Sequence, residues 1–114
     1  MVDKRRERNY TVVIGDVQCK WDTAKNAPNL LKHGVGFEEA ATVFADSQYQ
    51  IIEDPEHSEN EERFIALGIS TNYRILTVCH TVIEDEREVR IFSARQATVA
   101  EETQYGGKTN ARRV

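Results

Sequence analysis

Three apolar segments in the second half of the chain constrain the fold most. Residues 63–70, 74–83 and 88–95 are each typical of a β-strand, and connections of three and four residues join them. Connections this short join only antiparallel neighbours, because a parallel crossover needs a dozen or more residues. The sequence therefore predicts an antiparallel sheet built from these segments, with residues 49–53 as a further short strand.

A helix is predicted over residues 23–33. Asp22 suits the N-cap position, and Gly34 suits the left-handed conformation that ends a helix. Pro28 lies beyond the first turn, where it removes a backbone hydrogen bond. Either a kink at this proline or a later helix start capped by Asn26 is therefore expected.

A second short helix is predicted over residues 37–44, because its apolar residues recur at helical spacing on one side. In the preceding helix, Leu30 and Leu31 are expected to face the core. The apolar stripe of the second helix consists of Phe37, Ala40, Ala41 and Phe44.

The two ends of the chain carry further signals. Residues 17–21 alternate apolar and polar side chains, which predicts a strand with Val17, Cys19 and Trp21 inward. Residues 10–14 either pair with it as a hairpin or merge with it into one bent strand. Residues 98–101 have the spacing of a capping box, which starts a last helix that Gly106 and Gly107 are expected to end.

These elements predict an α+β domain, with an antiparallel sheet of four to five strands, two N-terminal helices and one C-terminal helix. The 114 residues are expected to form a single domain that buries roughly two-thirds of the chain's surface. Residues 1–10 are a possible flexible arm, and residues 108–114 are expected to fray.

The charge distribution favours one cationic face on an acidic protein. The chain has 15 Lys and Arg against 19 Asp and Glu, a net charge of −4, which argues against coating nucleic acid by bulk charge. Nine carboxylates and no Lys or Arg lie between His33 and Glu62, whereas five arginines lie from Arg63 to Arg95. Local patches therefore matter more than the total charge.

Composition and motifs exclude several classes of protein. No apolar run approaches the roughly 20 residues of a membrane span, no secretory signal is present, and two cysteines in apolar runs fit a reducing cytoplasm. The P-loop, GxGxxG, HExxH, CxxC and GxSxG patterns are absent. We therefore expect neither a metal nor a cofactor, and look for acid, base and guanidinium chemistry.

The strand pattern decides which candidate side chains can meet. In residues 88–95, Arg90 and Arg95 point to opposite faces of a regular strand. One of them must reach a common site from an edge or a bulge, or only one belongs to it. Arg95 could also cap carbonyl groups, and His80 could be a hydrogen-bonded histidine of the sheet.

Short motifs in a fixed order, spanning about residues 17–105, resemble one protein family. They are Trp21-Asp22, Lys25-Asn26, Asn29-Leu30, Lys32-His33-Gly34-Val35, Phe37-Glu38-Glu39-Ala40, Val43-Phe44, Asp54-Pro55-Glu56-His57-Ser58, Glu61-Glu62-Arg63-Phe64, Gly68, Arg74, Val78, Thr81, Arg90-Ile91-Phe92-Ser93-Ala94-Arg95, Ala97, Glu101 and Tyr105. The chain thus resembles the BrnT-type toxins, small members of the RelE superfamily of bacterial toxin–antitoxin systems. Gly36 departs from the Ser or Thr cap expected there.

The resemblance implies a RelE-like fold and a ribonuclease toxin that cleaves RNA and so inhibits translation. It also implies a co-encoded BrnA-type antitoxin with a ribbon-helix-helix part that binds DNA. The toxin would then bind operator DNA only through this antitoxin. The alternative is a non-catalytic module that binds the antitoxin and acts as co-repressor of its own operon.

By position, Glu62, Arg63 and Arg95 match charged motif positions of the family. RNA cleavage without metal needs a base, cations on the phosphorane and an acid for the leaving oxygen. We infer Glu62 as the base and Arg63 and Arg95 as phosphate clamps, with His80 as a possible acid. Lys25 on the first helix and Arg90 on the last strand are expected to bind RNA.

Overall fold

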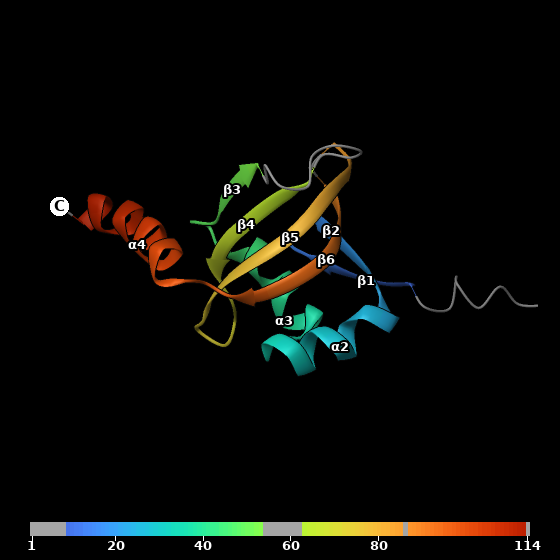
Figure 1. The fold of residues 1–114 in the computed structure, drawn as a ribbon. Coiled ribbons are helices and arrows are strands. Elements are labelled where there is room, and N and C mark those ends of the chain that lie inside the picture. Colours follow the sequence, from blue (N-terminus) through green and yellow to red (C-terminus); the bar gives the residue numbers. More distant parts are fainter. Residues whose placement is uncertain (1–8, 54–62, 86, 114) are drawn as a thin grey trace, which may run out of the picture.

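The computed structural model describes residues 9–53, 63–85 and 87–113. These residues form an α+β structure around one mixed sheet, whose strand order is β1-β2-β6-β5-β4-β3 (Figure 1). The strands are β1 (Asn9–Ile14), β2 (Val17–Asp22), β3 (Gln50–Glu53), β4 (Phe64–Ile69), β5 (Ile75–Glu84) and β6 (Glu88–Gln96).

The prediction of four to five antiparallel strands is wrong in number and in one pairing. The described sheet has six strands, and β2 runs parallel to β6, while the other neighbours are antiparallel. The short turns predicted the meander β4-β5-β6 correctly, because they fix local pairings. The β2–β6 pair joins residues about seventy positions apart, which no local pattern indicates.

The N-terminal hairpin resolves an alternative that the sequence left open. β1 pairs antiparallel with β2 in continuous register from Asn9–Asp22 to Ile14–Val17, and Gly15 in the turn has φ +61°. The two helices therefore follow a hairpin rather than open the domain. Cys19 and Trp21 of β2 are buried, as their alternation predicts.

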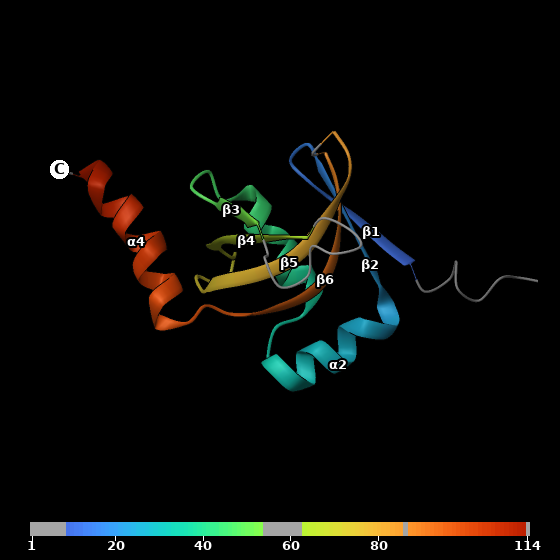
Figure 2. The same cartoon turned by 45° about the horizontal axis from the view of Figure 1, so that its top comes forward.

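Helices cover one face of the sheet. They are α2 (Thr23–His33), α3 (Phe37–Ala41) and the 3₁₀ turn η1 (Thr42–Ala45), and α4 (Val99–Arg113) projects from the other end of the sheet (Figures 1 and 2). The stripe of α3 and η1 is buried as predicted, against apolar residues of β2, β4, β5 and β6. No helix among the described residues is long and apolar enough to cross a membrane.

The ends of α2 match the prediction. The Asp22 side chain accepts a hydrogen bond from the Ala24 N–H at 2.9 Å, and Gly34 ends the helix with φ +71°. The later start at Asn26 is wrong, because α2 begins at Thr23 and contains Pro28. Asn26 instead accepts a hydrogen bond from the Phe37 N–H at 2.8 Å. Asn26 thereby supplies the cap that Gly36 lacks at the start of α3.

The buried residue of α2 is Asn29, and the prediction that Leu30 and Leu31 face the core is wrong. Leu30 is 53% exposed and Leu31 is 84% exposed. The Asn29 amide donates to the carbonyls of Val35 and Ala94 and accepts from the Ala94 N–H. Asn29 thus pairs with the backbone of β6, and this pairing sets which side of α2 faces the sheet.

The C-terminal helix begins as predicted and ends later. The Thr98 hydroxyl accepts from the Glu101 N–H at 3.1 Å and the Glu101 carboxylate accepts from the Thr98 N–H at 2.8 Å, a capping box. The expected end at Gly106 and Gly107 is wrong, since α4 continues to Arg113. A helical glycine costs about 1 kcal/mol but does not interrupt the backbone hydrogen bonds.

Candidate functional site

A β-bulge in β6 places Arg90 and Arg95 on the same face of the sheet. Cys79 pairs with Ser93, but the next residue, His80, pairs with Ile91, so Phe92 has no partner on β5. The extra residue shifts the alternation of the strand by one position, so that Arg90 and Arg95, which would lie on opposite faces of a regular strand, share one face. The bulge is one of the alternatives that the strand pattern left open.

Phe92 lies at the centre of a group of cations. The Arg63 guanidinium carbon lies 4.4 Å from the centre of its ring, and the Lys25 ammonium nitrogen lies 5.4 Å from it. These contacts are within the range of cation–π attraction. They bring the start of α2 and the residue before β4 to the bulged part of β6.

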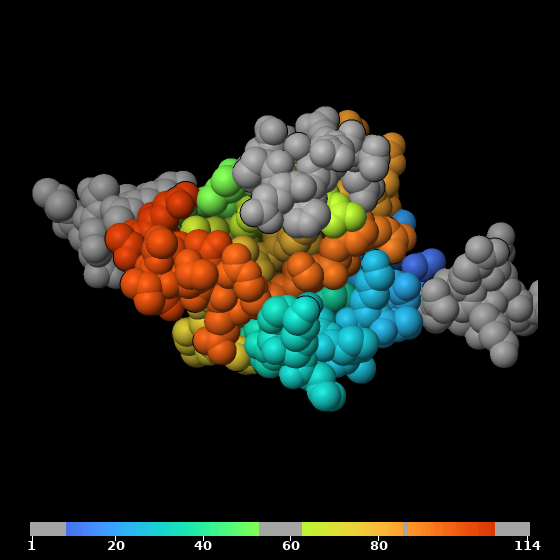
Figure 3. Space-filling model, viewed as in Figure 1, coloured from blue at the N-terminus to red at the C-terminus, as the bar shows by residue number. Residues whose placement is uncertain are grey.

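The register places Arg90 on the same face of the sheet. It pairs with Thr81 of β5 and with Lys20 of β2. Lys20 forms an ion pair with Glu88 at 2.5 Å, whereas Arg90 and Lys25 form no ion pair with a described residue. We call Lys25, Arg63, Arg90 and Arg95, with Phe92 between them, the cationic face. Figure 3 shows β6 at the surface between α2 and α4.

Arg95 forms a two-point ion pair with Glu101, the first acidic residue of α4. Nη1 of Arg95 lies 2.8 Å from Oε1 of Glu101, and Nη2 lies 3.0 Å from Oε2. The hydrogen bond with Arg95 is the largest cause that lowers the pKa of Glu101 to about 2. The same hydrogen bond raises the pKa of Arg95. Thr77 of β5 donates its hydroxyl proton to the same carboxylate at 2.9 Å.

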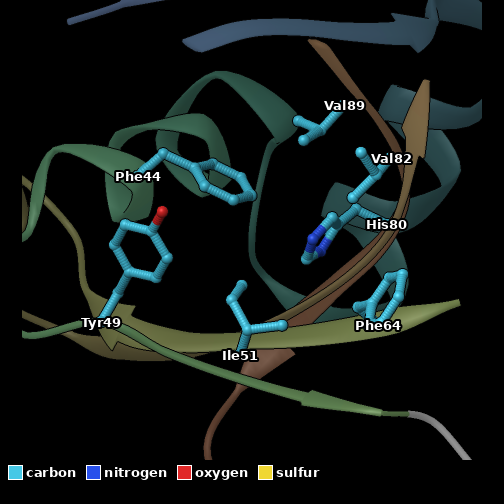
Figure 4. A pocket seen from close by; sticks show the side chains of 7 residues that line it. All are labelled: Phe44, Tyr49, Ile51, Phe64, His80, Val82 and Val89. Carbon is cyan, nitrogen blue, oxygen red and sulfur yellow. The ribbon is translucent and has the colours of Figure 1, made fainter. Parts of the chain in front are cut away.

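His80 lies on the opposite face of the sheet. It is 1% exposed, and its ring packs edge-on against Phe44 with the centroids 5.2 Å apart. Burial lowers the pKa of His80, so the ring is neutral at pH 7. Figure 4 shows the imidazole pointing into an apolar pocket. Arg90 pairs with Thr81, the residue after His80 in β5, so the side chains of His80 and Arg90 lie on opposite faces. The structure therefore does not bring His80 together with the arginines.

Of the six candidate residues, the structure joins Lys25 and Arg63 through Phe92 and places Arg90 and Arg95 on the same face of the sheet. Glu62 lies outside the described residues. Among the residues that the structure describes, no three His, Cys, Asp or Glu side chains are close enough to hold a metal ion.

A family model described as the ribonuclease toxin BrnT of type II toxin–antitoxin systems matches residues 21–101. The chain belongs to the BrnT family. No curated protein matches the chain. The BrnT match includes every described residue of the cationic face, together with α2, α3 and the start of α4.

Two residues of the candidate site in this BrnT chain are not predicted from the sequence. Phe92 appears in the family motif, but the role of its ring depends on a bulge that no residue pattern shows. Glu101 was assigned to a capping box, and it also binds Arg95 six residues earlier. An acidic residue in the first turn of a helix that follows an arginine at a strand end is a signal that could have found it.

Proposed function

We propose that this BrnT toxin cleaves RNA on its cationic face, without a metal ion, and so inhibits translation in the cytoplasm. We also propose that the fold is RelE-like and that a BrnA-type antitoxin with a ribbon-helix-helix part neutralises the toxin. The observation that carries the proposal is the contact of Lys25 and Arg63 with one aromatic ring, on the face of the sheet that also carries Arg90.

The phosphate contacts are proposed for Arg63 and Arg90. An arginine presents two parallel N–H donors and stays charged, which suits the extra negative charge of a pentacovalent phosphorane. Arg63 and Arg90 lie on the same face, because Arg63 precedes β4 and Arg90 pairs with Thr81. Lys25, which is exposed, adds a cation at the rim for the RNA backbone.

The Phe92 ring is proposed to stack against the RNA nucleobase next to the cleaved bond. Unpaired RNA bases stack on aromatic side chains, and such a contact is worth about 1–3 kcal/mol. The ring is half-buried and already lies beside two cations. Stacking there would hold the neighbouring phosphate against the guanidinium groups.

Glu62 is proposed to accept the proton of the 2′-hydroxyl group, and water is proposed to donate a proton to the leaving 5′-oxygen. The 2′-oxygen loses its proton to a base as it attacks phosphorus, and the 5′-oxygen leaves with a proton. Glu62 directly precedes Arg63 in the sequence and is the proposed base. His80 is not part of this proposal, because its ring points into the pocket on the other face.

Arg95 is proposed to position α4 rather than to bind phosphate in the resting protein. Both of its terminal nitrogens already contact Glu101. A phosphate would have to displace this carboxylate before Arg95 could bind it. Arg95 and Glu101 together keep α4 beside the cationic face.

Expression without an antitoxin tests the proposal. Growth arrest and RNA cleavage that persists in EDTA would support a metal-independent ribonuclease. Normal growth, together with tighter binding of operator DNA by the toxin–antitoxin pair than by the antitoxin alone, would instead show the non-catalytic co-repressor. Cleavage that EDTA abolishes would overturn the metal-free mechanism while leaving the family assignment intact.

A further inference from the structure

A pocket of about 140 Å³ opens on the face of the sheet opposite the cations (Figure 4). Aromatic rings of Phe44, Tyr49 and Phe64 line it, and His80 points into it from β5. Two apolar side chains form its rim, Ile51, which is 47% exposed, and Val82, which is 37% exposed. None of these side chains has a role in the proposed RNA cleavage.

His80 provides one polar atom inside this apolar pocket. Its Nδ1 lies 3.2 Å from the Val78 carbonyl oxygen, which can only accept, so Nδ1 carries the ring proton. In the neutral ring, Nε2 is then a hydrogen-bond acceptor, and His80 makes no further polar contact among the described residues. The ring is 99% buried and points into the pocket, so a ligand in the pocket can reach it.

The size of the pocket limits the ligand to a single ring. An engineered protein cavity of about 150 Å³ lined by apolar side chains binds benzene. The pocket described here has a similar volume and three aromatic walls. Its buried acceptor distinguishes it from a purely apolar cavity and favours a ring that carries a donor.

We propose that this pocket is a binding site for a small phenol-like molecule, whose ring packs among Phe44, Tyr49 and Phe64 and whose hydroxyl donates to Nε2 of His80. The hydroxyl satisfies the buried acceptor, and the ring fills the apolar volume. The site is separate from the cationic face, so its occupancy does not require RNA.

Titration of the full chain with phenol, followed by amide chemical shifts, tests the site. Phenol is expected to bind with a dissociation constant of about 1 mM, as for a ligand of so few atoms, and to shift residues around His80. Benzene has the same ring without the donor and is expected to bind about fivefold more weakly, because one hydrogen bond contributes about 1 kcal/mol. Equal affinities would overturn the role of His80.

Two neighbouring substitutions provide a matched pair. Val82→Trp places a large ring at the rim of the pocket, whereas Ile83 is also exposed but does not line it. Val82→Trp is expected to abolish the phenol shifts, and Ile83→Trp is expected to leave the affinity within about twofold of that of the original chain. Undiminished binding in Val82→Trp, or shifts that map to the cationic face, would overturn the proposal.

His80→Leu tests the acceptor directly in a side chain of similar volume. This variant is expected to bind phenol and benzene equally, provided that its amide spectrum shows the folded chain. Should it be unfolded, the comparison of Val82→Trp with Ile83→Trp still decides the location of the site. A folded His80→Leu chain that retains the preference for phenol would contradict the proposal.

Discussion

Arg95 and Glu101 form a two-point ion pair between the end of β6 and the first turn of α4, with nitrogen–oxygen distances of 2.8 and 3.0 Å. The carboxylate also accepts hydrogen bonds from the Thr77 hydroxyl and the Thr98 N–H. One side chain thus connects the sheet, the connection after it and the helix. Its four contacts make Glu101 the residue that fixes the start of α4.

Glu101→Gln should lower the free energy of unfolding by about 1–2 kcal/mol at pH 7, because Arg95, Thr77 and Thr98 then donate to a neutral amide and no longer to a charged carboxylate. Denaturant unfolding followed by circular dichroism measures the change. Glu102→Gln is the control, since Glu102 is exposed on the same helix. An equal loss in both variants would contradict the role given to Glu101.

The stability that the Arg95–Glu101 pair contributes should fall as the pH falls. The pKa of Glu101 is about 2 in the folded chain and about 4.3 in an unfolded one. The lowered pKa contributes stability that is present above pH 5 and lost as the pH falls from 5 to 2. The difference in unfolding free energy between the original chain and Glu101→Gln should therefore narrow over this range. A constant difference from pH 7 to pH 3 would contradict the assignment.

Asn29→Ala should destabilise the fold by about 2–4 kcal/mol, because it leaves buried backbone groups of Val35 and Ala94 without their partner. Thermal unfolding measures the loss. Lys32→Ala changes an exposed residue of the same helix and should cost less than about 0.5 kcal/mol. A similar, small effect of both substitutions would show that Asn29 does not fix α2 to β6.

A methyl group added at Gly68 and one added at Gly106 should have opposite effects on the stability of the chain. In Gly68→Ala the new Cβ would lie 2.8 Å from Cγ1 of Val43 and 3.0 Å from Cβ of Tyr49, a clash that should cost about 1–3 kcal/mol. Gly106 lies inside α4 with nothing within 4 Å of an added Cβ. Gly106→Ala should stabilise the chain by about 0.5–1 kcal/mol. Calorimetry measures the melting temperatures of both variants. A melting temperature that is higher for Gly68→Ala than for Gly106→Ala would contradict the prediction.

Local signals in the sequence predicted much of the fold. Asp22 and Gly34 fix the ends of α2, and Thr98 starts α4, because caps and left-handed glycines depend on neighbouring residues alone. The meander of β4, β5 and β6 was predictable for the same reason, since its turns are too short for any other pairing.

Long-range contacts determine what could not be predicted. The pairing of β2 with β6 joins residues about seventy positions apart, and the exposure of Leu30 and Leu31 follows from the contact of Asn29 with Ala94 of β6. In the site, the arginines were selected by residue type, and the register places Arg63, Arg90 and Arg95 on one face of the sheet. The position of Arg90 relative to Arg95 depends on the bulge at Phe92, a property of the pairing and not of β6 alone.

RNA binding should weaken with salt in proportion to the cations that contact phosphate. Three contacts from Lys25, Arg63 and Arg90 predict a slope of about −2 in a plot of log affinity against log salt for single-stranded RNA. Arg90→Ala should make this slope shallower by about 0.7. Fluorescence anisotropy with a short labelled RNA at several salt concentrations measures both values. An unchanged slope would exclude Arg90 from contact with phosphate.

The most direct test is the rate at which the purified toxin cleaves RNA in EDTA, compared with Arg63→Ala, Arg90→Ala and the control Arg87→Ala in an exposed turn. Loss of one donor to the transition state should slow cleavage by about 100-fold in the first two variants, while Arg87→Ala stays within about threefold. Full activity in Arg63→Ala and Arg90→Ala, or the same loss in Arg87→Ala, would contradict cleavage on the cationic face.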